Sequence, residues 1–96
     1  MPYVYAEHEI EDYDRWERHH EENAAERAAH GSLGTRAFRP VDDEDRVIVL
    51  QEVAADRLED ALAYYESDAF ADTLEAAGVV DVAASAVLEQ VHEQDA

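Results

Sequence analysis

The sequence predicts an α+β fold in one domain, residues 1–96, with strands and helices in the order β-α-β-β-α-β. Two observations carry this prediction. Apolar residues alternate near the N-terminus and then recur at intervals of three and four. A continuous apolar run, Val47-Ile48-Val49-Leu50, lies near the middle of the chain. Hydrophobic residues make up 47% of the sequence, and their regular placement argues against intrinsic disorder.

The first strand and the first helix are predicted from these two periodicities. Alternation over residues 3–10 predicts a strand, one face of which carries Val4, Ala6, His8 and Ile10. Asp12 is suited to cap a helix that runs to about Ala29. The inner stripe of this helix comprises Tyr13, Trp16, His20, Ala24 and either Arg27 or Ala28. Gly31 then suits the positive-φ position that often follows a helix end.

A hairpin is predicted next, with arms over residues 33–39 and 46–53 and an acidic turn between them. The second arm is apolar on both faces, which is typical of a central strand covered on both sides. We expect Arg36 or Arg39, in the first arm, to pair with Glu7 or Glu9, because charges on a sheet face need partners.

The second helix is predicted from Asp56 and Glu59, whose spacing resembles a capping box. Its buried stripe comprises Leu58, Ala61, Leu62 and Tyr65. Ser67-Asp68 interrupts or re-caps this helix, and a second stretch with Phe70 and Leu74 ends at Gly78. A final strand is predicted over about residues 83–91.

With right-handed crossovers, this order gives a four-stranded antiparallel sheet with both helices on one face, the ferredoxin-like arrangement. A single layer of helices leaves the other sheet face uncovered, although the predicted central strand is apolar there. A contiguous apolar face usually marks an interface. We therefore expect a two-fold homodimer formed through the open sheet face.

The charge of the chain is extreme: it has 25 acidic residues, seven arginines and no lysine, for a formal net charge of −18. Proteins of extreme halophiles have such compositions, since concentrated salt screens the repulsion. This surface disfavours nucleic acid and anionic membranes as partners. The sequence has no cysteine, no apolar stretch long enough to span a membrane and no basic, apolar leader, so we expect a cytoplasmic protein.

Four segments resemble the antibiotic-biosynthesis-monooxygenase type of dimeric α/β-barrel protein, in particular short stand-alone members from haloarchaea. They are VYAEHEIEDYDRW, RAAHGSLGTRAFR, DDEDRVIVLQEV and YYESDAFADTLEAAGVV. The resemblance implies two sheets packed into a barrel and a ligand pocket in each subunit between its sheet and its helices. Related proteins include cofactor-independent oxygenases, haem-degrading enzymes and isomerases. The haem-degrading scheme is not matched, because the only asparagine is Asn23 and residues 57–77 contain no histidine.

Six residues are candidates for a site in such a pocket. His8 and His20 are the candidate catalytic residues, because an imidazole in a pocket can hold or relay a proton near neutral pH. Candidate substrate-binding residues are Trp16, Arg27, Tyr65 and Phe70. Each has a structural alternative: a hydrogen-bonded core histidine, plain aromatic core, or an ion pair of Arg27 with Glu52 or a chain terminus.

Metal and cofactor chemistry receive little support from the sequence. Adjacent His19 and His20 point about 100° apart on a helix, so they cannot chelate one ion together. His8, His20 and a carboxylate remain an alternative, but no usual ligand spacing is present, and we expect His19, His30 and His92 to face solvent. The three glycines are isolated, so no nucleotide or flavin cofactor is expected.

Two functional hypotheses follow. The first is a cofactor-independent monooxygenase or isomerase that acts on a small, partly aromatic molecule in a sheet–helix pocket. The second is a non-catalytic dimer that binds a small ligand or serves in a stress response. An open cavity that reaches His8 would favour the first hypothesis, whereas a filled core around His8 would count against it.

Overall fold

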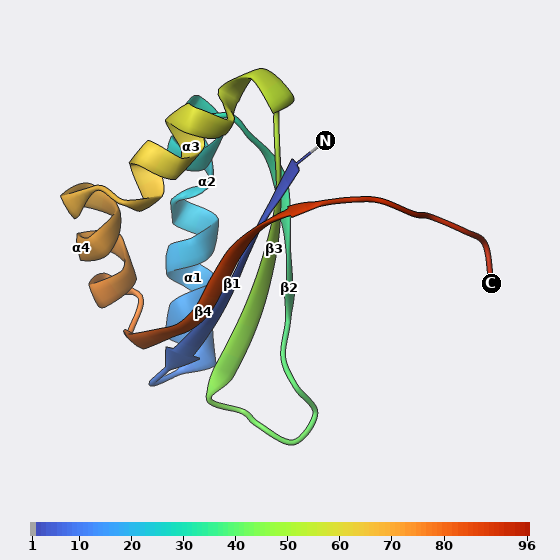
Figure 1. Ribbon diagram of the computed structural model, residues 1–96. Coiled ribbons are helices and arrows are strands. Elements are labelled where there is room, and N and C mark those ends of the chain that lie inside the picture. Colours follow the sequence, from blue (N-terminus) through green and yellow to red (C-terminus); the bar gives the residue numbers. More distant parts are fainter. Residues whose placement is uncertain (1) are drawn as a thin grey trace.

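One antiparallel sheet with the strand order β2-β3-β1-β4 forms one layer of the computed structural model, which describes residues 2–96 (Figure 1). The strands are β1 (Pro2–Ile10), β2 (Ser32–Phe38), β3 (Arg46–Val53) and β4 (Val79–Glu89). The α-helices are α1 (Tyr13–Glu22), α2 (Ala24–Ala29), α3 (Leu58–Tyr65) and α4 (Asp68–Ala76). All four helices lie on the same side of the sheet. This is the ferredoxin-like fold predicted from the sequence.

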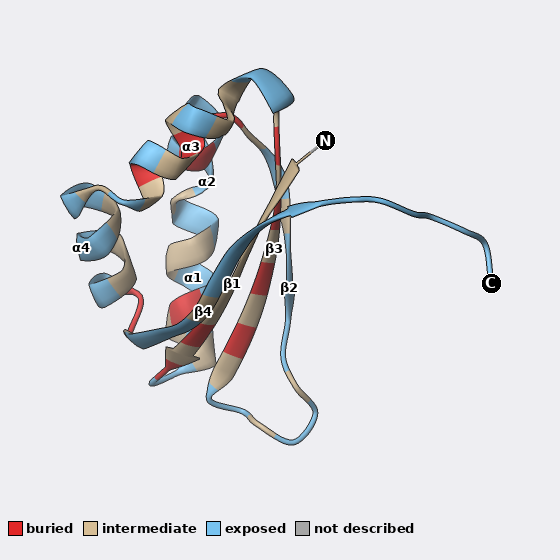
Figure 2. Cartoon of the chain, in the orientation of Figure 1, coloured by how far each residue is buried: buried red, intermediate tan, exposed pale blue. Residues whose placement is uncertain are grey.

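The strand register determines which side chains face the helices. On β3, every second residue is buried, which places Val47, Val49, Gln51 and Val53 on the helix side (Figure 2). His8 of β1 pairs with Val47 of β3 and is also buried. Alternation along a strand therefore directs His8 and Gln51 into the space between the sheet and the helices.

One cluster of buried apolar residues lies where β1 ends and β4 begins. It consists of Ile10, Trp16, Val47, Val49 and Ala77, with Tyr13 and Val79 packed against it. Asp12 caps α1 as predicted, because its side chain accepts a hydrogen bond from the Arg15 backbone N–H at 3.1 Å. Trp16, one turn into α1, is thereby fixed over the sheet.

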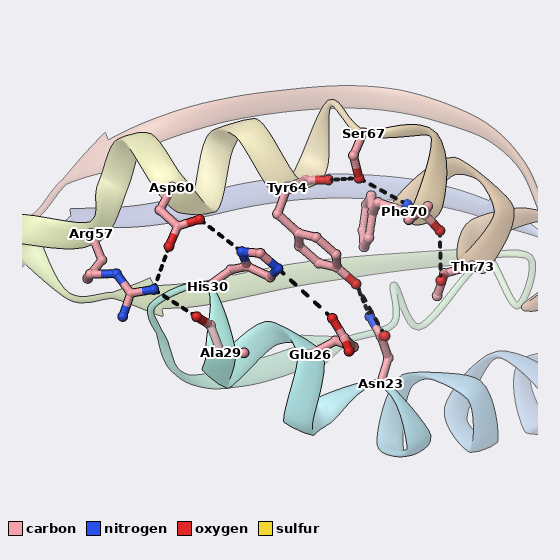
Figure 3. Close-up of polar contacts among 11 residues, drawn as sticks. Asn23, Glu26, Ala29, His30, Arg57, Asp60, Tyr64, Ser67, Phe70 and Thr73 are labelled. Atoms are coloured by element: carbon pink, nitrogen blue, oxygen red, sulfur yellow. Dashed lines mark hydrogen bonds and ion pairs between the residues drawn. The ribbon is translucent and has the colours of Figure 1, made fainter.

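The sequence analysis predicted one continuous helix to about Ala29, and this is wrong: the helix is divided at Asn23. The Asn23 side chain makes two hydrogen bonds with the Tyr64 hydroxyl, at 3.0 and 3.2 Å (Figure 3). Asn23 has φ −87° and ψ 3° and separates α1 from α2. Its partner lies 41 residues away, so the interaction that accompanies this break is tertiary.

The predicted capping box at Asp56 and Glu59 is also wrong. A 3₁₀ turn occupies Ala55–Arg57, and α3 begins at Leu58 without a side-chain cap. This segment is held by Arg57, which donates to the Ala29 carbonyl at 2.7 Å and pairs with the Asp60 carboxylate (Figure 3).

The other half of this network contains His30, which was expected to face solvent. Its ring is half-buried, lies 2.8 Å from the Asp60 carboxylate and stacks on Tyr64 with ring centroids 4.5 Å apart. His30 and Asp60 therefore join α2 to α3. Together with the bonds between Asn23 and Tyr64, this contact fixes one helix pair against the other.

The last helix and strand agree with the prediction in part. Ser67 caps α4 as expected, because its hydroxyl accepts from the Phe70 backbone N–H at 3.2 Å. The final strand begins at Val79, four residues earlier than predicted, and ends at Glu89. Gly78 has φ +81°, a conformation that favours glycine, and it turns the chain directly into the pairing between Val79 and Ile10.

The outer face of the sheet carries the main ion-pair cluster. Arg46 lies 3.2 Å from both Glu7 and Glu9, so the predicted pairing of Arg36 or Arg39 with these carboxylates is wrong. The reason is the order of the strands in the sheet: β3 lies beside β1, whereas β2 is separated from β1 by β3. Arg39 lies instead over the Tyr13 ring, 4.8 Å from its centroid.

No helix within residues 2–96 is long and apolar enough to cross a membrane.

Candidate functional site

A cavity of about 420 Å³ lies between the helix-facing side of the sheet and the helices. This volume falls within the range of small-molecule sites, about 300–1,000 Å³. Every candidate site residue from the sequence analysis contributes to its wall: His8, Trp16, His20, Arg27, Tyr65 and Phe70. Strands β1, β3 and β4 also line it, largely with apolar side chains such as Val4, Val49 and Val87.

His8 is bound from one side by Trp16. The indole N–H donates to His8 Nδ1 at 3.3 Å, and both side chains are buried. Burial lowers the pKa of His8 from its ordinary 6.5 to about 4, so the ring is neutral near pH 7. Because Nδ1 accepts from Trp16, the ring proton resides on Nε2. His8 is therefore a neutral hydrogen-bond donor in a wall of the cavity.

His20 lies against the other side of Trp16, with ring centroids 4.6 Å apart and planes inclined by 12°. Its Nε2 is 2.8 Å from the Thr35 hydroxyl of β2. The pKa of His20 is lowered to about 4, mainly by burial and to a smaller extent by the charge of Arg27. Trp16 thus separates two neutral imidazoles that both line the cavity.

Arg27 is buried, with an exposed fraction of 8%. Its Nη1 donates to the His20 carbonyl at 2.8 Å, at the end of α1. The predicted ion pair with Glu52 is absent, and within residues 2–96 no carboxylate lies within 4.0 Å of this guanidinium. Burial lowers the pKa of Arg27 from its ordinary value of 12.5, while the neighbouring Tyr65 and Tyr64 act to raise it.

Tyr65 and Phe70 form the aromatic wall on the α3 and α4 side. Their rings meet edge to face with centroids 4.9 Å apart. Burial raises the pKa of Tyr65 to about 12, against a smaller opposite effect of Arg27, so its hydroxyl stays protonated. This wall offers apolar ring surface and one hydroxyl.

Sequence reasoning missed Gln51, which also lines the cavity. Its side chain is 4% exposed, and its Nε2 is buried without a hydrogen-bond partner in the described part of the chain. A signal was present in the sequence: Gln51 is the polar member of the otherwise apolar alternation Val47, Val49, Val53. Asn23 and His19 line the cavity as well.

The geometry does not bring metal ligands together. Within residues 2–96, no group of three or more His, Asp or Glu side chains could hold a metal ion. What the cavity provides is a set of neutral and cationic hydrogen-bond donors beside aromatic surface.

These features define the class: a ferredoxin-like α+β domain with a chamber of small-molecule size between its sheet and its helices. Solved structures share this architecture, although their sequence identities are low, and the likeness shows the fold alone. A candidate antibiotic biosynthesis monooxygenase from Caulobacter crescentus is 18% identical, with a TM-score of 0.70 and coverage of 95% of this chain and 90% of that one.

Two further structures are similar in the same way. SnoaB, a cofactor-independent oxygenase from Streptomyces nogalater, is 14% identical, with a TM-score of 0.66 and coverage of 96% of this chain and 93% of its own. A dimeric ferredoxin-like protein from an uncultured marine organism is 17% identical, with a TM-score of 0.66 and 97% coverage of both chains. No protein-family model matches the sequence, and no curated protein matches it either.

Proposed function

We propose that this protein is a small, cofactor-independent monooxygenase or isomerase of the antibiotic-biosynthesis-monooxygenase-like type. Its substrate is a small, partly aromatic molecule that occupies the cavity. The observation that carries this proposal is the chamber itself, which is open beside His8 and His20 instead of being filled by core side chains. Similarity to the fold of SnoaB adds support.

The proposed reaction begins with loss of a proton from a carbon activated by a neighbouring phenol or ketone. The resulting enolate gives one electron to O₂, the carbon–oxygen bond forms, and loss of water converts CH₂ to C=O, so that R₂CH₂ and O₂ yield R₂C=O and H₂O. An isomerase stops at the enolate and returns the proton to a different carbon. Both reactions need a stabilised oxyanion and a group that exchanges protons.

His8 and His20 are assigned to these two needs. The His8 Nε2–H, held in this tautomer by Trp16, donates to the substrate oxygen on which negative charge develops. A neutral imidazole can act in this role because its N–H donates a hydrogen bond to the oxygen without transferring its proton. His20, also neutral near pH 7, exchanges the substrate proton. Phe70 and Tyr65 provide ring surface for the substrate.

The test is oxygen consumption with a panel of anthrones and hydroquinones in concentrated potassium chloride. His8→Gln should lower kcat by about 10²-fold or more, the range for loss of one acid–base or oxyanion group. His92→Gln is the matched control, since His92 is exposed in the C-terminal segment. Equal turnover of His8→Gln and the unaltered protein would remove His8 from the mechanism.

The alternative function is a non-catalytic dimer that binds a small ligand or serves in a stress response. The contact between His20 Nε2 and the Thr35 hydroxyl favours it, because it gives His20 a structural role. Saturable binding of panel members without oxygen consumption or isomerisation in any of them would support this alternative over the enzyme.

Homodimer formation through the outer sheet face is part of the proposal. Ile48 and Leu50 are half-buried there, and Phe38 and Leu88 are 54% and 40% exposed. Phe38→Glu should shift the molar mass measured by light scattering from dimer to monomer. Val41→Glu, in the turn outside the sheet, should leave the dimer intact. A monomer at micromolar concentration in the unaltered protein would contradict the proposal.

We also propose that the chain is a single cooperative domain adapted to a salt-rich cytoplasm. The net charge of −18 supports this, because potassium chloride at about 1 M reduces the Debye length to about 3 Å. Thermal unfolding should be one transition whose Tm rises with added salt. Two separate transitions, or a Tm that falls with salt, would contradict it.

A further inference from the structure

Arg27 is a buried cation without an anion. Its hydrogen bond to the His20 carbonyl satisfies one donor and leaves the charge uncompensated, since no carboxylate of residues 2–96 is within ion-pair distance. Burying a charge without a partner is unfavourable. In a chain with 25 acidic residues, the lack of an ion-pair partner for Arg27 is unexpected unless a ligand supplies the anion.

Gln51 is an independent second observation. Its Nε2 is a buried donor without an acceptor, on a side chain that lines the same cavity. The register places Gln51 directly opposite Thr35, whose hydroxyl contacts the His20 ring, and the His20 carbonyl binds Arg27. Gln51 and Arg27 therefore line the same chamber and are connected through Thr35 and His20.

Within residues 2–96, the one buried charge in the cavity wall is the guanidinium of Arg27, whose sign is opposite to that of the net charge of the molecule. Among residues 2–96, Glu66 is the one acidic residue that contributes to the wall, and it is exposed. Arg27 therefore faces a chamber from which carboxylates are otherwise absent in the described chain, within a protein whose net charge is −18. The buried positive charge of Arg27 favours binding of an anion over binding of a cation in this chamber.

We infer that Arg27 and Gln51 form an anion subsite that binds the carboxylate group of a small aromatic acid. A carboxylate has two oxygens that can accept from the guanidinium and from the amide N–H at the same time. The ring of the acid then lies against Trp16 and Phe70. This inference rests on the proposed function in one respect, because the ligand occupies the same chamber. It adds that the substrate carries a negative charge.

The test compares two probes of equal shape, 2-naphthoate and its neutral amide, 2-naphthamide, by titration calorimetry. Trp16 is the only tryptophan, so quenching of its fluorescence reports independently that the probe enters the chamber. The intact protein should bind 2-naphthoate about tenfold or more tightly than 2-naphthamide. The preference should persist in about 2 M KCl, because buried contacts are little screened.

Variants separate the two donors. Arg27→Met keeps an unbranched side chain but removes the guanidinium, and it should abolish the preference for the carboxylate while leaving 2-naphthamide affinity within about threefold. Gln51→Met should weaken 2-naphthoate binding by about three- to tenfold. Arg18→Met, which removes an exposed arginine of α1, is the matched control and should change neither affinity.

The inference fails if the intact protein binds both probes equally or prefers the amide, a result that does not depend on any variant folding. It also fails if Arg27→Met, shown to be folded by circular dichroism, retains the preference. Neither result bears on turnover. Conversely, a strong preference for 2-naphthoate in a protein that consumes no oxygen with any panel member supports the subsite and contradicts the monooxygenase.

Discussion

The unpartnered amide of Gln51 leads to a prediction about stability. Gln51→Met replaces the amide with an unbranched apolar group of similar volume, so neither a void nor overpacking is introduced. A buried polar group without a partner is unfavourable by about 1–3 kcal/mol. The free energy of unfolding of the unliganded protein should therefore increase, by roughly 1–2 kcal/mol once imperfect packing of methionine is allowed for.

The measurement is thermal and urea unfolding, followed by circular dichroism in concentrated potassium chloride without ligand. For a chain of this size, each kcal/mol raises Tm by about 4–8 °C. The matched control is Thr35→Val on the neighbouring strand, which is also nearly isosteric. It removes a hydroxyl that has a partner, the His20 Nε2 at 2.8 Å, and should lower the free energy of unfolding by about 1 kcal/mol.

The two substitutions are thus expected to have opposite signs. If Gln51→Met destabilises the protein as much as Thr35→Val does, the Gln51 amide has a partner in the unliganded state, and its assignment to a ligand loses its basis. If Gln51→Met stabilises the protein but weakens 2-naphthoate binding, the residue is kept for a ligand at the expense of stability.

Three further outcomes are expected. The pKa values of His8 and His20 are both about 4 in the folded state and near 6.5 when unfolded, so the unfolded state binds more protons between these values; stability should fall as pH decreases from 6.5 to 4, by at most about 3 kcal/mol for each histidine, and His8→Gln but not His92→Gln should make this part of the urea-unfolding profile less steep. Gly31→Ala should lower Tm by several degrees, because Gly31 has φ +100° and an added Cβ would lie 2.5 Å from the Arg57 Cβ; an unchanged Tm would contradict this geometry. Arg46→Met should destabilise the protein in dilute buffer and less so in concentrated salt, since it removes the surface ion pairs with β1; an equal loss in both buffers would assign the effect to packing.

The fold was predictable because its main determinants are local. The alternation in residues 3–10 and the apolar run of β3 indicate strands from residues that are close in the sequence. The caps at Asp12 and Ser67 can likewise be recognised from the residues of the next helical turn. The element order then leaves few topologies.

What sequence reasoning missed depends on contacts between distant segments. The break at Asn23 accompanies its bonds to Tyr64, and the partner of Glu7 is Arg46 because β3, not β2, lies beside β1. The lack of a carboxylate near Arg27 is a property of the folded chain alone. Gln51 differs, because its place in an apolar alternation was visible, but only the structure shows that its amide has no partner.

The acidic exterior and the buried cation Arg27 together affect how fast an anionic ligand arrives. Such a ligand must first approach a molecule with a net charge of −18, and long-range repulsion slows that encounter in dilute buffer. Added salt removes the repulsion, whereas departure from the buried guanidinium of Arg27 depends on short-range contacts that salt barely changes. In stopped-flow measurements on Trp16, the association rate constant for 2-naphthoate should therefore rise with potassium chloride while the dissociation rate constant stays nearly constant, so that the protein captures its ligand fastest in concentrated salt.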